Sequence, residues 1–429
     1  MSKMNIISEK LLADIMSVSN ATINKWKRDK KISPISSDSS DENSEYLFKD
    51  LAHLPQIKSM IESPQSSQED ETPLRDYKSI ELFAGAGGLA IGLERAGLKA
   101  VALNEIDPKA CATLRLNRPD WNVIEADVSK VDFQEFNDVD LLSGGFPCQA
   151  FSYAGNKLGF EDARGTLFFE FARAIKEVQP KVFLGENVRG LFTHDGGRTL
   201  DSIKEIIKEI GYTLVEPRVM KAIFHKVPQK RERLFLVGIR NDLVEHLNFK
   251  WPKPYHRVMT VKDALKAGYL YDTDVPKSDG QLYAKRKAEV LEMIPPGGCW
   301  KDLPDEIQRE YMKSSYFMGG GKTGMARRLS WDSPSLTLTC SPAQKQTERC
   351  HPEETRPLSV REYARIQTFP DDWVFEGAKT SQYKQIGNAV PVNLAHAMGK
   401  RIIALLNNIE KGTTKKTLSL SAPDGADSG

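Results

Sequence analysis

The chain has 429 residues, of which 40% are hydrophobic and 28% charged, a composition typical of a globular protein with about two or three domains. It contains no apolar run of roughly eighteen residues and no secretory signal, so we expect a cytoplasmic protein without a membrane span. The net charge of +2 indicates no particular partner, and five scattered cysteines without a CxxC pair predict neither a disulfide framework nor a metal site.

Residues 1–31 are basic, with seven lysines or arginines and three acids. Within them, residues 7–28 predict two short helices, because apolar side chains recur on one face of each and a serine-containing turn at 17–19 lies between them. The pair resembles a helix-turn-helix, whose second helix enters the major groove of DNA. A small packing or dimerisation element with a basic surface is the alternative.

Residues 32–75 reverse the charge, with three basic and nine acidic residues, and they are rich in serine. This composition predicts an acidic linker. A short apolar island within it, YLFKDLAHLPQIKSMI, predicts one small helix.

From Lys78 onward, short apolar strands alternate with helical segments. This alternation predicts the α/β class, with a Rossmann-like doubly wound sheet in a catalytic and cofactor-binding domain over residues 76–250. In such sheets ligands bind beyond the carboxyl ends of the strands.

After about residue 250 the alternation stops, and proline and glycine clusters such as WPKPYH, IPPGG and MGGGKTG interrupt the chain. We expect a smaller, loop-rich second domain over residues 251–375. A C-terminal helix at 376–410 is expected to complete the catalytic domain, and the tail from 411 to 429 is expected to be disordered.

The first strand leads into ELFAGAGGLA, which places Gly85 and Gly87 in the glycine turn of a nucleotide-binding strand–turn–helix unit, with Glu105 at the end of the second strand. This pattern alone is also typical of a dehydrogenase. Asp127, at the end of the third strand, favours an adenosine without a pyrophosphate, because one acid suits the ribose hydroxyls and the other the adenine amino group. S-adenosylmethionine is such a ligand. For each acid alone, a helix cap or a solvated charge is the alternative.

The next strand, in LLSGGFPCQAFS, delivers Cys148 to the ligand-facing edge of the sheet. Glu186 ends the following strand, and PQKRERLF supplies two arginines that can favour a thiolate. A thiol, a carboxylic acid, arginines and an adenosine cofactor fit methylation of cytosine at carbon 5. Addition of a thiolate to carbon 6 makes carbon 5 enamine-like, and a carboxyl group at ring nitrogen 3 stabilises the charge that develops.

Nine motifs then occur in one order between residues 78 and 406: FAGAGG, NEID, ADV, GGFPCQAFS, GTLFFE, ENV, PQKRERLF, RPLSVREYARIQTFPDDW and QIGNAVP. They resemble the cytosine-5 DNA methyltransferases of bacterial restriction–modification systems, with a weaker match over 241–326. The resemblance implies that Cys148 is the nucleophile, that Glu186 engages ring nitrogen 3, and that Arg231 and Arg233 support the site and the flipped base. It also implies an S-adenosyl-L-methionine pocket lined by Phe83, Gly85, Gly87, Glu105, Ile106, Asp127, Pro147, Asn388 and Val390.

Two positions depart from the family's pattern. Ser359 stands where threonine is frequent, and Ile106 stands where an aromatic residue often lies beside the adenine. The second departure would weaken stacking on the cofactor.

In this family a segment after the nucleophile closes over double-stranded DNA once the target base has left the stack. The region between PQKRERLF and RPLSVREYARIQ reads the sequence in this family, so the resemblance implies that the second domain, over residues 251–375, is the target-recognition domain. We expect DNA contacts at Gln149, Ser152, Arg164, Gln229, Arg327 and Arg328. A solvated basic surface is the alternative for each arginine of the second region.

The expected partners are double-stranded DNA, bound by a monomer, and a cognate restriction endonuclease that shares the target site without stable contact. One alternative is an RNA cytosine methyltransferase. Another is a DNA-binding regulator that uses residues 7–28, for example on its own promoter. Methylation of an exocyclic amine is disfavoured, because IPPGG lacks the acid or asparagine and the aromatic residue that such enzymes carry around their prolines.

Overall fold

The computed structural model describes residues 6–35, 44–63, 71–147, 166–245, 249–317 and 324–421. None of the helices in these ranges is both long enough and apolar enough to cross a membrane. The chain divides into two compact units. The sheet unit takes residues 69–220, 232–252 and 395–429, and the loop-rich unit takes residues 1–68, 221–231 and 253–394.

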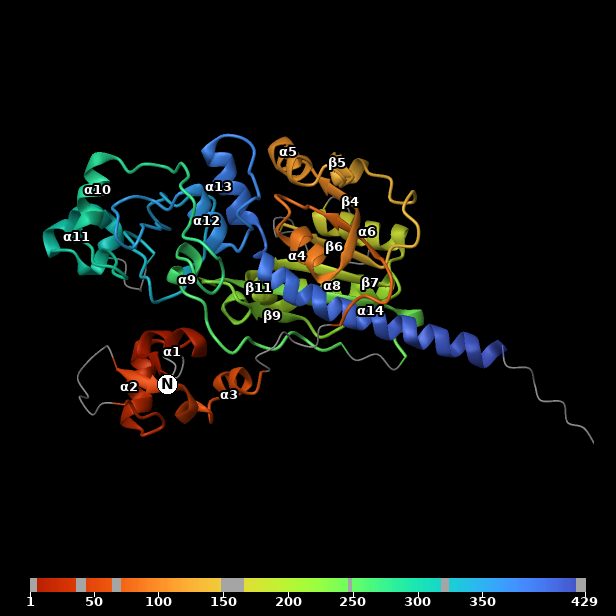
Figure 1. The fold of residues 1–429 in the computed structure, drawn as a ribbon, viewed down its shortest axis with the longest axis horizontal. Coiled ribbons are helices and arrows are strands. Elements are labelled where there is room, and N and C mark those ends of the chain that lie inside the picture. The colour runs from red at the N-terminus through yellow and green to blue at the C-terminus, as the bar shows by residue number, and fades with distance from the viewer. Residues whose placement is uncertain are drawn as a thin grey trace, which may run out of the picture. The chain divides into compact units, whose positions relative to one another are not determined.

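The sheet unit is built on eight strands in the order β5-β4-β3-β6-β7-β11-β8, with β9 paired to β11 (Figure 1). The five strands from β5 to β7 in this order run parallel, as the alternation of strands and helices predicts. They are β3 Tyr77–Leu82, β4 Leu98–Glu105, β5 Val123–Glu125, β6 Leu141–Gly145 and β7 Val182–Val188. The Rossmann-like α/β class is confirmed.

The other edge of the sheet is antiparallel. β11 Glu232–Arg240 runs antiparallel to both β7 and β8 Tyr212–Leu214, and it also pairs with β9 Arg218–Lys221. The chain reaches β11 from β8 without a crossover helix, which a parallel connection would require.

Long helices pack on the sheet: α4 Gly88–Ala96, α5 Pro108–Asn117, α6 Leu167–Val178, α8 Arg198–Glu209 and α14 Val392–Ser421 (Figure 1). α14 approaches α4 closely, since a Cβ added at Gly399 would lie 2.6 Å from Ala96 Cβ. Between α6 and the sheet, the rings of Phe146, Phe168 and Phe171 pack with centroids 5.2 to 5.4 Å apart. Phe146 directly follows β6, so this packing anchors the segment that leads to Cys148.

The N-terminal module comprises the described residues between 6 and 63, and it belongs to the loop-rich unit. Its elements are β1 Ile6–Ser8, α1 Glu9–Met16, α2 Asn20–Arg28, β2 Glu45–Leu47 and α3 Pro55–Ile61. The side chains of Ser8 and Ser19 cap α1 and α2. Two helices with a short turn between them are therefore present over residues 7–28, as predicted.

The linker prediction is wrong for residues 44–63. β2 pairs with β1, and α3 buries Ile57 and Met60 in the same apolar cluster as Leu12 of α1. The apolar island that predicted a helix is a structural part of the module, because its buried side chains outweigh the acidic composition around it.

The rest of the loop-rich unit consists of short helices and a small two-stranded pairing. The helices are α9 Val261–Leu265, α10 Lys285–Glu292, α11 Asp305–Met312, α12 Val360–Ile366 and α13 Lys379–Asn388. β10 Gln229–Lys230 pairs parallel with β12 Ser335–Leu336. The predicted boundaries assign 221–231 to the catalytic domain and α13 to the C-terminal helix, whereas both belong to this unit. The β10–β12 pairing and the hydrogen bond from Tyr383 Oη to Leu358 O, at 2.7 Å, tie them to it.

The C-terminal helix also differs from its predicted range of 376–410. α14 begins at Val392 and continues to Ser421, so the prediction of a disordered tail is wrong for residues 411–421. No proline occurs between residue 411 and Pro423, and nothing in that stretch forces the helix to end.

Candidate active site

The turn between β3 and α4 borders open space at the carboxyl end of β3. Phe83, Gly85 and Gly87 have positive φ angles of 57°, 55° and 86°. A Cβ built at Gly85 would meet no atom within 4 Å. The turn therefore leaves room for a ligand, and its backbone conformation favours glycine at 85 and 87.

Glu105 ends β4, and three backbone amides hold its carboxylate. Oε2 accepts a hydrogen bond from Gly85 N at 2.7 Å, and Oε1 accepts from Ile106 N and Asp107 N at 2.8 Å each. Because Oε2 accepts only one of these bonds, it has a lone pair left for a ligand hydroxyl.

Ile106 and Asp127 stand just after β4 and β5. Ile106 is 63% exposed and presents apolar surface. The Asp127 carboxylate accepts hydrogen bonds from Ser129 N and Oγ at 2.9 and 2.8 Å, which lower its pKa, so it is ionised at neutral pH. Glu105 and Asp127 are carboxylate acceptors that suit the ribose hydroxyls and the amino group of an adenosine, and the apolar surface of Ile106 suits its purine.

The backbone before Cys148 is fixed by Asn187. Asn187 Nδ2 donates to Phe146 O at 2.8 Å, and its Oδ1 accepts from Val188 N at the same distance. Pro147 is exposed at the end of this described stretch. Sequence reasoning missed Asn187 as a site residue, although the motif ENV contains it. Four predicted site residues lie outside the described residues: Cys148, Gln149, Ser152 and Arg164.

Glu186 forms an ion pair with Arg233 across β7 and β11. Arg233 Nε lies 2.7 Å from Glu186 Oε1, and the two side chains are only 13% and 11% exposed. The other carboxylate oxygen faces Gly145, since a Cβ added there would lie 2.8 Å from Glu186 Oε2. The pair thus holds a carboxylate beside the segment that leads to Cys148.

A third carboxyl group, Glu81 on β3, lies beneath the site. Burial raises its pKa well above the usual range, and the charges of Glu105 and Glu186 add to the effect. Burial therefore favours the neutral form of Glu81, whereas a backbone hydrogen bond from Ala90 favours its carboxylate. Sequence reasoning missed it because β3 is almost wholly buried and shows no polar alternation.

Gln229 and Arg231 hold the loop-rich unit together from within. Gln229 is fully buried; its Nε2 donates to Gln367 Oε1 and its Oε1 accepts from Leu338 N. Arg231 is 1% exposed and donates to Leu338 O at 3.1 Å and to Gly387 O at 2.9 Å. The predicted DNA contact of Gln229 is therefore wrong, because the whole side chain is used inside the unit. The role of Arg231 at the flipped base stays a prediction.

The two arginines predicted to contact DNA differ in exposure. Arg328 is 4% exposed and donates to Leu291 O and Thr355 Oγ1, both at 2.8 Å. Its predicted DNA contact is wrong, since its guanidinium group binds interior acceptors. Arg327 is partly exposed and donates to Gly297 O at 2.7 Å, and its DNA contact stays a prediction.

Asn388 is the last residue of α13 in the loop-rich unit, and Val390 stands two residues later. Asn388 Oδ1 accepts from Cys340 Sγ at 3.2 Å, and Val390 is buried. Their contacts with a cofactor stay predictions.

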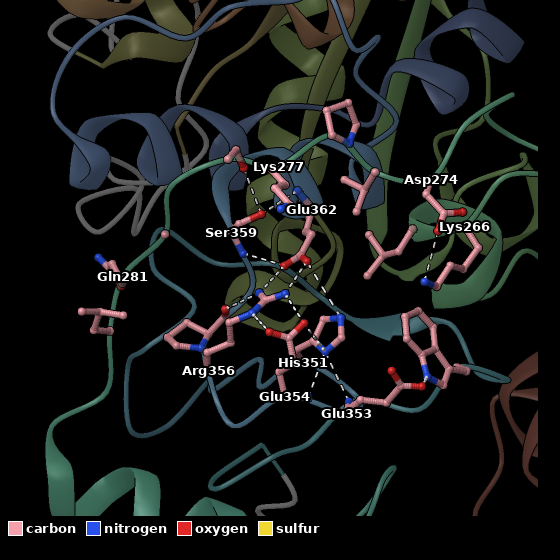
Figure 2. A pocket seen from close by; sticks show the side chains of 18 residues that line it. Lys266, Asp274, Lys277, Gln281, His351, Glu353, Glu354, Arg356, Ser359 and Glu362 are labelled. Atoms are coloured by element: carbon pink, nitrogen blue, oxygen red, sulfur yellow. Dashed lines mark hydrogen bonds and ion pairs between the residues drawn. The ribbon is translucent and has the colours of Figure 1, made fainter.

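A cavity of about 540 Å³ opens in the loop-rich unit (Figure 2). Arg356 binds both oxygens of Glu362 at 2.8 Å and both oxygens of Glu354 at 2.9 Å. Glu362 in turn accepts from Ser359 N at 2.7 Å, in a capping box that starts α12. The charged groups on this wall satisfy one another, so the network orders the start of α12. Ser359 supplies the capping hydroxyl that threonine would supply.

The buried His351 on the same wall makes stability depend on pH. Its Nδ1 accepts from the backbone N of Glu353 and Glu354 at 3.2 and 3.1 Å, and burial lowers its pKa below the usual value. The unfolded chain therefore takes up the proton more readily. Stability from the neutral imidazole is full above about pH 6.5 and is lost as pH falls below it.

We expect His351→Asn to flatten this dependence, because Oδ1 of asparagine can accept in place of Nδ1 and does not titrate. Urea unfolding of both proteins at about pH 7.5 and 5.5 measures it. At pH 7.5 the variant should lose about 1 kcal/mol, since the imidazole packs against Trp331. An equal fall of the unfolding free energy in both proteins would contradict the role of His351.

The fold and the site together define a Rossmann-like methyltransferase. The family model of the C-5 cytosine-specific DNA methylases matches residues 77–404, and the chain belongs to this family. It is a DNA cytosine-5 methyltransferase, as its motifs predict.

Two type II methyltransferases support this assignment. The type II methyltransferase M.Eco47II of Escherichia coli is 63% identical over 405 residues, covering 93% of this chain and 96% of that protein. The type II methyltransferase M.PspPI of Psychrobacter sp. strain TA137 is 59% identical over 408 residues, covering 95% and 98%. Both matches extend into the segment before residue 77, so these relatives share the N-terminal module at least in part.

Among solved structures, a DNA modification methyltransferase encoded within an E. coli prophage matches with a TM-score of 0.59 and 26% identity, over 77% of this chain and 100% of that chain. The family is described as acting on DNA, and this match does not support the RNA alternative.

Proposed function

We propose that this methyltransferase uses S-adenosyl-L-methionine to methylate carbon 5 of a cytosine flipped out of a short, specific double-stranded DNA sequence. The observation that carries the proposal is the Glu186–Arg233 ion pair beside the segment that leads to Cys148. The open glycine turn, Glu105, Ile106 and Asp127, in the same unit, fit the adenosine of this cofactor.

Cys148 is the proposed nucleophile. Its thiolate sulfur forms a bond to carbon 6 of cytosine, which makes carbon 5 electron-rich. Bound S-adenosyl-L-methionine supplies the methyl group that carbon 5 takes. A water molecule that acts as the base then removes the proton from carbon 5. The bond between sulfur and carbon 6 breaks, and Cys148 is released as a thiolate together with 5-methylcytosine.

The surrounding residues position and stabilise these steps. Glu186 in its protonated form gives a hydrogen bond or a proton to ring nitrogen 3 as negative charge develops on the ring, and it takes that proton back when the thiolate leaves. Arg233 keeps the carboxyl group in place. Asn187 fixes the backbone before the nucleophile. Glu105 and Asp127 accept hydrogen bonds from the ribose hydroxyls and the adenine amino group.

The test is transfer of label from tritiated S-adenosyl-L-methionine to unmethylated genomic DNA and, in parallel, to RNA. Mass spectrometry of the hydrolysed product should identify 5-methylcytosine in DNA, and bisulfite sequencing then gives the target sequence. Label on an exocyclic amine, or in RNA alone, would overturn the proposal.

The type II relatives favour a role in a restriction–modification system, in which the protein protects host DNA from an endonuclease that reads the same sequence. We infer that the protein acts as a monomer on DNA, without stable contact to that endonuclease. The proposed location is the cytoplasm, where the DNA of the bacteria that carry the relatives lies.

A second candidate function is DNA contact through α2. The helix exposes Asn20, Asn24, Lys25 and Arg28, which are residue types that bind phosphates and base edges. Lys27 is different: it forms a 2.7 Å ion pair with the buried Glu9 of α1 and serves the fold of the module.

The double variant Lys25→Gln/Arg28→Gln tests this function while leaving the Lys27–Glu9 pair intact. If both side chains bind phosphates, the slope of log K against log salt for a DNA duplex should fall by about 2. An unchanged slope would support the alternative of a packing element with a solvated basic surface.

A further inference from the structure

The N-terminal module meets the segment that carries the PQKRERLF motif. Ile223 and Val258 belong to the same apolar cluster as Leu12 and Ile15 of α1. Lys221 Nζ also donates to Ser17 Oγ at 2.6 Å. The module is therefore docked against this part of the loop-rich unit by buried apolar surface.

Charged side chains gather beside this apolar contact. Lys230 of β10 forms an ion pair with Asp14 of α1. One turn earlier on α1, Lys10 Nζ lies 3.2 Å from the position that a Cβ at Gly297 would occupy. Arg327 Nη1 donates to the carbonyl oxygen of the same Gly297, at 2.7 Å. Lys10 and Arg327 thus converge on one glycine, next to the Asp14–Lys230 pair.

The cluster holds more positive than negative charge. The pKa of Lys10 is lowered, first by burial of its ammonium group and then by Arg327 and Lys230, while Asp14 opposes the shift. Burial raises the pKa of Asp14, while Lys230, Lys10 and Arg327 lower it, so one carboxylate faces all three cations. Lys10 reaches solvent, and Arg327 and Lys230 are partly exposed, so an anion can approach them.

We propose that Lys10, Lys230 and Arg327 form a binding site for a backbone phosphate of DNA at the junction between the N-terminal module and the rest of the loop-rich unit. This inference rests on the proposed function, because it assigns the anion to the DNA substrate. The site extends the proposed DNA-binding surface beyond the target-recognition region to Lys10, which precedes residues 77–404 that match the methylase family.

The salt dependence of DNA binding tests the site. Fluorescence anisotropy with a labelled duplex, from about 50 to 300 mM KCl, gives the slope of log K against log salt. Loss of one phosphate contact in Lys10→Gln should reduce the slope by about 0.9. Lys58→Gln is the matched control in the same module, because Lys58 lies on α3, its side chain is 63% exposed and its nearest acid, Glu62, is 3.9 Å away.

Asp14→Asn separates a phosphate site from a merely structural cluster. The substitution removes the negative charge that competes with phosphate, so DNA affinity should stay equal or rise. A structural cluster would instead make Lys10→Gln and Asp14→Asn weaken DNA binding together, with a fall in thermal stability, and that result would overturn the proposal.

Two further outcomes count against the site. An equal slope in Lys10→Gln and Lys58→Gln would overturn it. Thermal stabilisation of the wild type by inorganic phosphate, lost in Lys10→Gln while the DNA slope stays unchanged, would reassign the cations to a free phosphate.

Methyl transfer by the wild type is measured on the same samples. Its absence would overturn the proposed function, whereas methyl transfer with equal slopes in Lys10→Gln and Lys58→Gln overturns the phosphate site alone.

Discussion

Cys148→Ser is expected to reduce methyl transfer to DNA by roughly 10⁴-fold or more, the scale on which loss of a covalent nucleophile acts in other enzymes. A serine hydroxyl is a far weaker nucleophile at neutral pH than a thiolate, so carbon 6 is not attacked and carbon 5 stays unreactive. The measurement is tritium transfer to unmethylated DNA, with 5-methylcytosine quantified by mass spectrometry.

DNA that contains 5-fluorocytosine makes the test of Cys148 independent of turnover. Fluorine at carbon 5 cannot leave as a proton does, so the adduct between sulfur and carbon 6 should persist in the wild type and survive denaturing electrophoresis. Cys340→Ser is the control, because Cys340 is exposed and a serine hydroxyl can reproduce its bond to Asn388 Oδ1. An adduct that forms in Cys148→Ser, or that disappears in Cys340→Ser, would remove Cys148 from its proposed role.

The sequence predicts local features of this molecule well. Alternating strands and helices place the parallel half of the sheet, and the predicted turn at 17–19 does separate two helices, with Ser19 capping α2. The glycine turn and Glu105 are also local, since strand, turn and acid follow one another within one nucleotide-binding unit. Such features depend on residues close in sequence, so their pattern can be read without the tertiary structure.

The features that sequence reasoning missed depend on distant partners. Arg328 is typical of a surface arginine by type, but acceptors from Leu291 and Thr355 hold it in the interior. Gln229 is buried for the same reason, because Gln367 and Leu338 lie more than a hundred residues further along the chain. Only the fold brings such groups together, and a motif alone does not tell a DNA contact from an internal hydrogen bond.

Glu186→Gln is expected to lower kcat by about 10² to 10⁴-fold, the usual contribution of a general acid. The amide can still occupy the space of the carboxyl group, but it cannot protonate ring nitrogen 3, and it removes the charge that Arg233 compensates. Single-turnover methyl transfer at saturating DNA measures the effect. The dissociation constant of S-adenosyl-L-methionine should change little, because Glu186 is not among the groups proposed to bind the adenosine.

Gly145→Ala is a second, geometric test of the same carboxyl group. The added Cβ would lie 2.8 Å from Glu186 Oε2, so the carboxyl group must shift while its chemistry is unchanged. A displacement of this kind should cost up to about 10²-fold in rate. If Glu186→Gln lowers the rate of methyl transfer and Gly145→Ala does not, the proton on Glu186 matters and the exact position of its carboxyl group does not. If both retain the wild-type rate, ring nitrogen 3 is served by another group, and the role of Glu186 is wrong even where that of Cys148 holds.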